Sequence, residues 1–177
     1  QWYLFYHDSE LSPDFDKTRS MRADSLFFDN DGNIKKVLPT LRGVGISSAY
    51  NKIQIDRYSD VGGSGVAFQY LDPQDTFQGW MLVFKDPKAK VRYNKVDFEN
   101  STPKELLIKV NVSHQSKVSV EVNDAKGNLI VKTILKPTDG FTEITLPVQA
   151  KLTGVQDLLL KVQGQGVIQI DWLKFIK

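Results

Sequence analysis

The chain has 177 residues, of which 41% are hydrophobic and 25% charged, and its formal net charge is +2. This composition is ordinary for a soluble globular protein of one domain plus an additional segment, and the small, dispersed charge argues against nucleic-acid binding. Cysteine is absent, which excludes disulfides, thiolate catalysis and cysteine zinc sites. No apolar run approaches the roughly 20 residues of a spanning helix, so we expect no membrane span.

The first 47 residues predict two strand units around a loop. These are "WYLFYHD" and "DSLFFDNDGNIKKVLPT", separated by the polar "SELSPDFDKTRS". The motif "DNDGN" resembles half of a calcium-binding EF-hand loop, but the position that should hold its glutamate is Thr40, so we predict a hairpin turn. The next stretch, "RGVGISSAYN", has the glycine-rich composition of a linker between domains.

A predicted strand in "NKIQIDRYS" follows the linker. Its side chains alternate, so that Ile53 and Ile55 share one face while Gln54 and Asp56 share the other. Further along, the basic run "KDPKAKVRYNK" predicts a solvated strand face and a loop.

From Lys104 onward the sequence has a period of two, interrupted by turns. The predicted strands are "ELLIKVNVS", "KVSVEVN", "NLIVKTIL", "FTEITLPV", "DLLLKVQG" and "VIQIDWLKF", and turn sequences such as "DAKGN" and "PTDG" connect them. No segment shows helical spacing over three turns. The pattern therefore predicts an all-β protein, a sandwich or a barrel.

The last predicted strand contains an acidic residue, Asp171, between Ile170 and Trp172. A carboxylate in a half-buried strand needs a partner, because burial without one is costly. The earlier strand with Gln54 and Asp56 has the same mixture of oxygen-bearing and apolar side chains. We therefore expect the two strands to meet.

Two stretches resemble known families. "YLFYHDSELSPDFDKTRSMRADSLFFDNDGNIKKVLPTLRGVG" resembles the last blade of the five-bladed propeller of glycoside hydrolase family 43, and the rest, from "IQIDRYS" to "IDWLKF", resembles a family 6 carbohydrate-binding module. The resemblance implies a propeller blade segment with a linker at residues 1–47 and a jelly-roll β-sandwich at residues 48–177. Two stretches depart from the family pattern: "PQDTFQGWMLVFKDP" looks like an insertion, and "KAKVRY" replaces a G-D-aromatic triplet.

The resemblance also implies a structural calcium site. In family 6 modules the first and last strands supply its oxygen ligands, and these positions correspond to Gln54, Asp56 and Asp171. Calcium prefers six to eight hard oxygens. The alternative is that Asp171 accepts hydrogen bonds from loop N–H groups or pairs with Arg57.

A sugar-binding cleft in this family uses two aromatic side chains and an asparagine near the last strand. By resemblance, the second aromatic corresponds to Phe141 and the asparagine to Gln169, while the first could be Phe68, Tyr70 or Trp80. Aromatic faces stack on the C–H surface of a sugar. The alternative for each aromatic is a place in the core.

Residues 1–47 by themselves are expected to be incomplete. By resemblance, His7 reaches the central cavity of the propeller and Arg19 belongs to the following loop, whereas the two catalytic carboxylates lie in earlier blades. A single blade cannot bury its own hydrophobic faces. We therefore expect the chain to be the C-terminal part of a larger hydrolase and to be catalytically inactive alone.

The resulting hypothesis is a non-catalytic accessory module of a glycoside hydrolase. It predicts binding of arabinose- or xylose-containing plant cell-wall polysaccharide, outside the cytoplasm or on the cell surface. The alternative is a structural module that braces the catalytic propeller of the parent enzyme without binding sugar.

Overall fold

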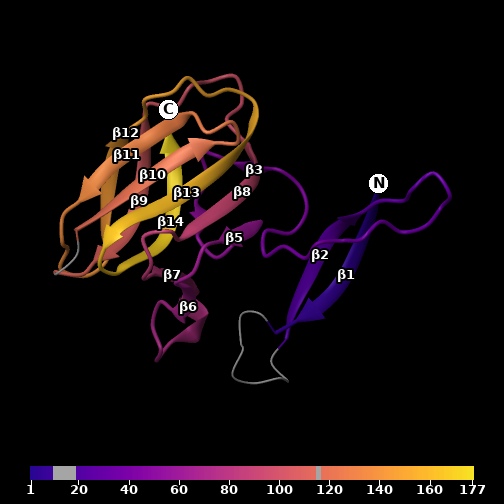
Figure 1. The fold of residues 1–177 in the computed structure, drawn as a ribbon, viewed down its shortest axis with the longest axis horizontal. Helices are drawn as coiled ribbons and strands as arrows, with labels where there is room; N and C mark the ends of the chain where they lie inside the picture. The colour runs from indigo at the N-terminus through magenta and orange to yellow at the C-terminus, as the bar shows by residue number, and fades with distance from the viewer. Residues whose placement is uncertain (10–18, 115–116) are drawn as a thin grey trace.

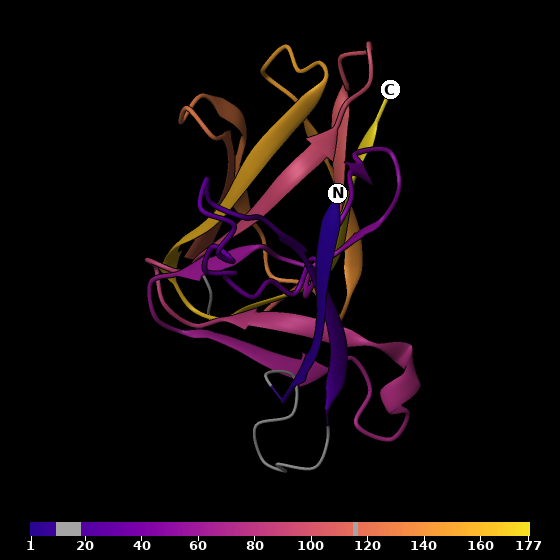
Figure 2. The same cartoon turned by 90° about the vertical axis from the view of Figure 1, so that its right-hand side faces the viewer.

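A computed structural model describes residues 1–9, 19–114 and 117–177. It contains a β-sandwich and, beside it, a two-stranded hairpin formed by the N-terminal residues (Figure 1). Figure 2 views the molecule from the hairpin side, where the hairpin lies in front of the sandwich. Within the described residues, no helix is long and apolar enough to span a membrane.

The first sheet of the sandwich has the strand order β11, β10, β13, β8 and β3, and β5 also pairs with β8. Neighbouring strands are antiparallel except β3, which runs parallel to β8. The bounds are β11 (Leu129–Leu135), β10 (Lys117–Asp124), β13 (Val155–Gln165), β8 (Lys90–Asp97), β3 (Ser47–Ser48) and β5 (Asp60–Gly62).

The second sheet has the order β12, β9, β14, β7 and β6, and β4 also pairs with β14. All of these pairings are antiparallel. A short 3-10 turn, η1 (Thr76–Gln78), lies between β6 and β7. The bounds are β12 (Thr142–Pro147), β9 (Glu105–Val112), β14 (Ile168–Ile176), β7 (Trp80–Phe84), β6 (Val66–Tyr70) and β4 (Ile53–Gln54).

The core lies between the two sheets, and the period of two in the sequence fills it. In β9, every second residue from Leu106 to Val112 is fully buried. Phe98 and Phe175 meet edge to face within this core, with ring centroids 4.8 Å apart. Burial of one such side chain stabilises the fold by about 1.5–3 kcal/mol. The predicted all-β jelly-roll sandwich with a preceding hairpin is confirmed.

The predicted strand with Gln54 and the last strand of the chain are neighbours, as expected. In the pairing of β4 with β14, Gln54 lies opposite Trp172 and Ile53 opposite Leu173. The backbone N–H of Ile55 also donates to the Asp171 carbonyl at 3.0 Å. Ile53 and Ile55 are buried in the core, so the predicted alternation of this short strand holds for its apolar face.

Two expectations about chain organisation were wrong. The second half of "RGVGISSAYN" is not a linker: it contains β3, and the fully buried Ala49 donates its N–H to the Asp97 carbonyl of β8. Nor is "PQDTFQGWMLVFKDP" wholly an insertion, because Trp80–Phe84 forms β7 beside β14. The small side chains at 47–49 fit the crowded edge of the sandwich. Small residues are also typical of flexible linkers, so composition alone does not distinguish a packed edge strand from a linker. The division between residues 47 and 48 stays a prediction, with β3 beginning at Ser47.

The hairpin consists of β1 (Trp2–Asp8) and β2 (Ser20–Leu26), paired from Trp2 opposite Leu26 to Asp8 opposite Ser20. The "DNDGN" motif follows as the predicted hairpin turn, closed by a bridge between Phe28 and Ile34. Asp29 Oδ1 accepts hydrogen bonds from the N–H groups of Asp31 and Asn33, and Gly32 supplies the positive φ of 83° that the turn requires.

Candidate functional site

One group of the predicted sugar-binding residues lies on β6 and β7, at the edge of the second sheet. Tyr70 is opposite Trp80 in the register, and their rings stack with centroids 4.0 Å apart. Phe68 stacks on Tyr58 at 5.8 Å and, like Trp80, packs partly against the core. All three predicted residues are half-buried, so each combines a structural contact with an accessible part.

The loop between these strands adds an aromatic residue that the sequence prediction did not include. Phe77, on η1, is 99% exposed. Its N–H donates to Asp75 Oδ1 at 3.2 Å, and the Gln78 amide donates to Asp75 Oδ2 at 3.3 Å. The Tyr70–Trp80 pair and this loop therefore form an aromatic edge that could stack on the C–H face of a sugar.

The other two predicted residues, Gln169 and Phe141, lie near β9. Gln169 Oε1 accepts a hydrogen bond from Asn111 Nδ2 at 2.8 Å, and Asn111 Oδ1 accepts one from Thr138 Oγ1 at 3.3 Å. Phe141 precedes β12, and its ring centroid is 5.6 Å from the Lys109 ammonium. These amides, the hydroxyl and the ammonium offer hydrogen-bonding groups of the kind that sugar hydroxyls need.

The two groups lie on opposite faces of the second sheet. Phe68 is opposite Leu82 of β7, whose side chain is in the core, whereas Gln169 is opposite the next residue, Val83. Because side chains alternate along a strand, Gln169 points away from the core. The structure thus brings Phe68, Tyr70 and Trp80 together, but it does not join them to Gln169.

Of the predicted calcium ligands, Asp56 and Asp171 are buried near each other, while Gln54 is exposed. Asp56 is 5% exposed and Asp171 4%. Burial raises the pKa of the Asp56 carboxyl; the Arg57 guanidinium opposes this rise, and the negative charge of Asp171 adds to it. The two carboxylates therefore interact electrostatically.

Both carboxylates have cationic partners in the chain itself. Lys109 Nζ is 2.8 Å from Asp171 Oδ2, and Arg57 Nε is 3.7 Å from Asp56 Oδ2. The sequence-based alternative placed Asp171 with Arg57, but Lys109 occupies that role. Among the described residues, no three acidic or histidine side chains gather where they could hold a metal ion. This donor set does not fit calcium, which needs six to eight oxygens.

His7 and Arg19 lie toward the same end of the hairpin and are both exposed. In the register, His7 is opposite Met21, and Arg19 immediately precedes β2. By alternation His7 shares a face with Phe5, which is 69% exposed. The predicted place of His7 and Arg19 at a propeller cavity stays a prediction.

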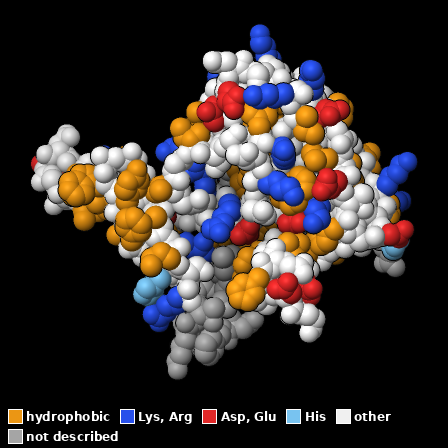
Figure 3. All heavy atoms as spheres, turned by 180° about the vertical axis from the view of Figure 1, so that it is seen from behind, with side chains coloured by type: hydrophobic (Ala, Val, Ile, Leu, Met, Phe, Trp, Pro, Cys, Tyr) orange, Lys and Arg blue, Asp and Glu red, His pale blue; other side chains and the backbone are white. Residues whose placement is uncertain are grey.

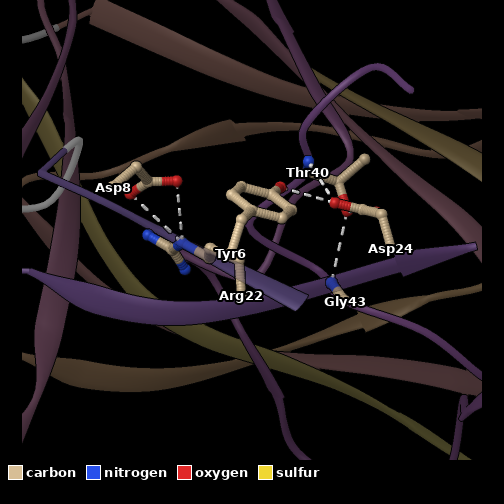
Figure 4. A network of polar contacts seen from close by, with 6 residues as sticks. All are labelled: Tyr6, Asp8, Arg22, Asp24, Thr40 and Gly43. Carbon is tan, nitrogen blue, oxygen red and sulfur yellow. Dashed lines mark hydrogen bonds and ion pairs between the residues drawn. The ribbon is translucent and has the colours of Figure 1, made fainter. Parts of the chain in front are cut away.

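Beneath the other face of the hairpin lies a polar network that the sequence prediction missed (Figure 4). The Asp24 carboxylate accepts hydrogen bonds from the Tyr6 hydroxyl at 2.6 Å, the Thr40 N–H at 3.0 Å and the Thr40 hydroxyl at 2.7 Å. Arg22 pairs with Asp8 at 3.3 Å. Burial and Asp24 raise the pKa of the Tyr6 phenol, so it stays a donor. In the sequence, this network is indicated by Arg22 and Asp24 in "SMRADSL", because residues two apart in a strand share one face.

The chain belongs to carbohydrate-binding module family 6, because the family model, described as "Carbohydrate binding module (family 6)", matches residues 61–177. No curated protein sequence matches the chain significantly.

Solved structures share the fold. A family 6 module from Clostridium cellulolyticum in complex with xylose is 24% identical, with a TM-score of 0.63, and the match covers 74% of this chain and all of the module. A glycoside hydrolase family 43 arabinoxylan arabinofuranohydrolase from Bacillus subtilis, in complex with cellotetraose, is 20% identical with a TM-score of 0.67. That match covers 99% of this chain but 38% of the hydrolase. Carbohydrate-binding module CBM36 in complex with calcium and xylotriose is 15% identical (TM-score 0.53; 71% of this chain, 98% of the module).

Proposed function

We propose that this chain is the non-catalytic accessory part of a glycoside hydrolase and binds arabinose- or xylose-containing plant polysaccharide outside the cytoplasm. Membership of carbohydrate-binding module family 6 supports the binding role. The xylose complex of a similar module supports a pentose ligand. The similarity to an arabinoxylan arabinofuranohydrolase over 99% of the chain, hairpin included, supports the family 43 parent.

The observation that carries the binding role is the aromatic edge at Tyr70 and Trp80. Their stacked rings, 4.0 Å apart, hold each other in place, and both remain partly accessible. A fixed aromatic surface loses little conformational entropy when a sugar stacks on it. Phe141 and Gln169, on the opposite face, would form a second, separate contact surface.

Isothermal titration calorimetry with xylo- and arabinoxylo-oligosaccharides tests the proposal. We expect heat of binding from the intact chain and a loss of at least about tenfold in affinity for Trp80→Ala. Phe141→Ala reports on the other face, and Trp2→Ala, in the hairpin, is the matched control that should bind normally. No binding to any member of such a panel would reject a pentose-polysaccharide ligand.

A second function, bracing of a catalytic propeller, is favoured by the exposed apolar side chains of the described residues 1–9 and 19–38. Several large side chains there are more than half exposed although a soluble surface rarely gathers so many. They are Trp2, Phe5, Met21, Phe27, Ile34 and Leu38. In the family 43 arrangement, this surface would pack against the neighbouring blades of the parent.

Deletion of the sandwich from the complete parent enzyme separates the two functions. Bracing predicts a lower melting temperature for the deleted enzyme, with unchanged retention on insoluble xylan. Polysaccharide binding predicts the reverse, a loss of retention with unchanged melting temperature. Full-length enzyme that releases no pentose from arabinosides or xylosides would contradict the assignment of the parent.

Calcium at Asp56 and Asp171 stays a prediction that the surrounding side chains do not support, since Lys109 and Arg57 already balance both carboxylates. A chelator should therefore leave the melting temperature of the chain unchanged. A clear decrease, reversed by added calcium, would restore the resemblance-based assignment.

A further inference from the structure

A cavity of about 420 Å³ lies between the segment after the hairpin and the start of the sandwich. Its walls come from the 42–48 segment, the β4 turn and β8, and three of its lining side chains are cationic: Arg42, Lys52 and Arg57. No described Asp or Glu lines it. On the face drawn in Figure 3, Lys and Arg side chains gather between the hairpin and the body of the sandwich. The volume of the cavity is within the range of small-molecule binding sites.

The positive charges of these three residues are partly balanced by groups that do not line the cavity. Arg57 is 3.7 Å from Asp56, and Lys52 lies 4.2 Å from the centre of the Trp172 ring. Burial lowers the pKa of Arg42, and Asp157 and Asp24 oppose this decrease through their charges. Lys52 and Arg57 remain exposed, so their charged ends stay available to a ligand.

Two residues that line the cavity also carry a buried donor and a buried acceptor without partners. Among the described residues, Arg42 Nε and Asn94 Oδ1 are two of only four buried side-chain polar atoms that form no hydrogen bond. Both residues line this cavity and an adjoining one of about 300 Å³. A buried unpaired polar group is costly, and a hydroxyl can satisfy both atoms because it donates and accepts. A lone carboxylate, or an anion without a hydroxyl such as sulfate, would leave the acceptor unpaired.

We propose that this cavity binds a uronic acid, with the carboxylate between Lys52 and Arg57 and ring hydroxyls at Arg42 and Asn94. Three cations supply the charge, and the unpaired donor and acceptor supply the selectivity for a hydroxylated ligand over a simple anion. The choice of an acidic sugar rests on the proposed polysaccharide-binding function. The cavity is separate from the aromatic edge at Trp80, so an experiment can contradict one proposal and leave the other standing.

Calorimetry of the full 177-residue chain with glucuronate, glucose and acetate tests the inference. We expect glucuronate to bind at least about tenfold more tightly than either glucose or acetate, since it alone carries both the charge and the hydroxyls. Equal binding of acetate and glucuronate, or no binding of glucuronate, would overturn it.

Substitutions at exposed positions locate the site without threatening the fold. Lys52→Gln and Arg57→Gln should each weaken glucuronate binding about tenfold, whereas Lys151→Gln, at an exposed lysine outside the cavity lining, should not. Trp80→Ala should leave glucuronate binding intact while abolishing neutral oligosaccharide binding. Glucuronate binding that survives both cavity substitutions would reject this site, whereas neutral oligosaccharide binding that survives Trp80→Ala would count only against the aromatic edge.

Discussion

The sandwich and the N-terminal hairpin are both built from strands rich in apolar residues. The sandwich buries these residues, whereas the hairpin leaves many of them exposed. Phe84 and Phe175 of the sandwich are fully buried, whereas Phe5 and Met21 of the hairpin are 69% and 78% exposed. The sandwich has two facing sheets, and each covers the other. The hairpin has a single layer, so one of its faces has no second sheet to pack against.

Polar contacts, rather than apolar packing, hold the hairpin strands and the following segment together. The Asp24 carboxylate ties Tyr6 of β1 to Thr40, and Arg22 ties β2 to Asp8 (Figure 4). Hydrogen bonds of this kind fix orientation, but each adds only about 0.5–1.5 kcal/mol. The comparison predicts a stable sandwich and a hairpin that gains its full stability from a partner surface.

The strongest test removes one phenylalanine ring from each region. Phe84→Ala should lower the free energy of unfolding by about 3–5 kcal/mol, because it leaves a cavity in the core. Phe5→Ala should change it by less than about 0.5 kcal/mol in this chain, because the ring is exposed. Urea denaturation measures both, and comparable losses would refute the contrast between the regions.

The next largest effect concerns the ion pair between Lys109 and the buried Asp171. Lys109→Met should destabilise the chain by about 2–3 kcal/mol, because it leaves the buried Asp171 carboxylate without its partner. Adding Asp171→Asn should restore most of the loss. Lys132→Met is the control, since Glu121 keeps Lys161 at 3.1 Å. A stabilised or unchanged Lys109→Met variant would show that the pair is not coupled.

Within the hairpin, Asp24→Asn should act locally. The amide keeps one acceptor oxygen but loses the charge-assisted bonds to Tyr6 and Thr40, a loss of about 1–2 kcal/mol. We expect roughly tenfold faster hydrogen exchange at the Thr40 and Gly43 amides, with the midpoint of sandwich unfolding unchanged. Asp31→Asn, in the exposed turn, is the control. A shift of the sandwich midpoint would mean that the regions unfold together.

The smallest effect is a pH dependence at Asp56. Its pKa is raised in the folded state, chiefly by burial, so its favourable contribution is complete below the unfolded value of about 3.9 and is lost as the pH rises through the folded pKa. Asp56→Asn should therefore stabilise the chain slightly at pH 7, and this gain should vanish toward pH 4. Melting temperatures across this range measure it; destabilisation at pH 7 would instead fit a calcium ligand.

Much of the fold was accessible from local pattern. The alternation in "ELLIKVNVS" predicted β9, and "DNDGN" predicted a hairpin turn, in which Asp29 Oδ1 accepts the N–H of Asp31. The site was less accessible. The sequence analysis did not identify Lys109 as a partner of Asp171, because their contact arises where the β14 register shifts between Ile170 and Trp172. Such a bulge redirects a side chain and leaves no mark in composition.

Side-chain alternation and the resemblance of whole segments were enough to predict the all-β class, the strand periods and the pairing of the strand at Ile53–Gln54 with the last strand. The folded structure was needed to learn which aromatic side chains share a face, which cation neutralises Asp171 and which cavity Arg42 and Asn94 line. Those outcomes depend on strand order and register, which join residues far apart in the chain and therefore have no local signal.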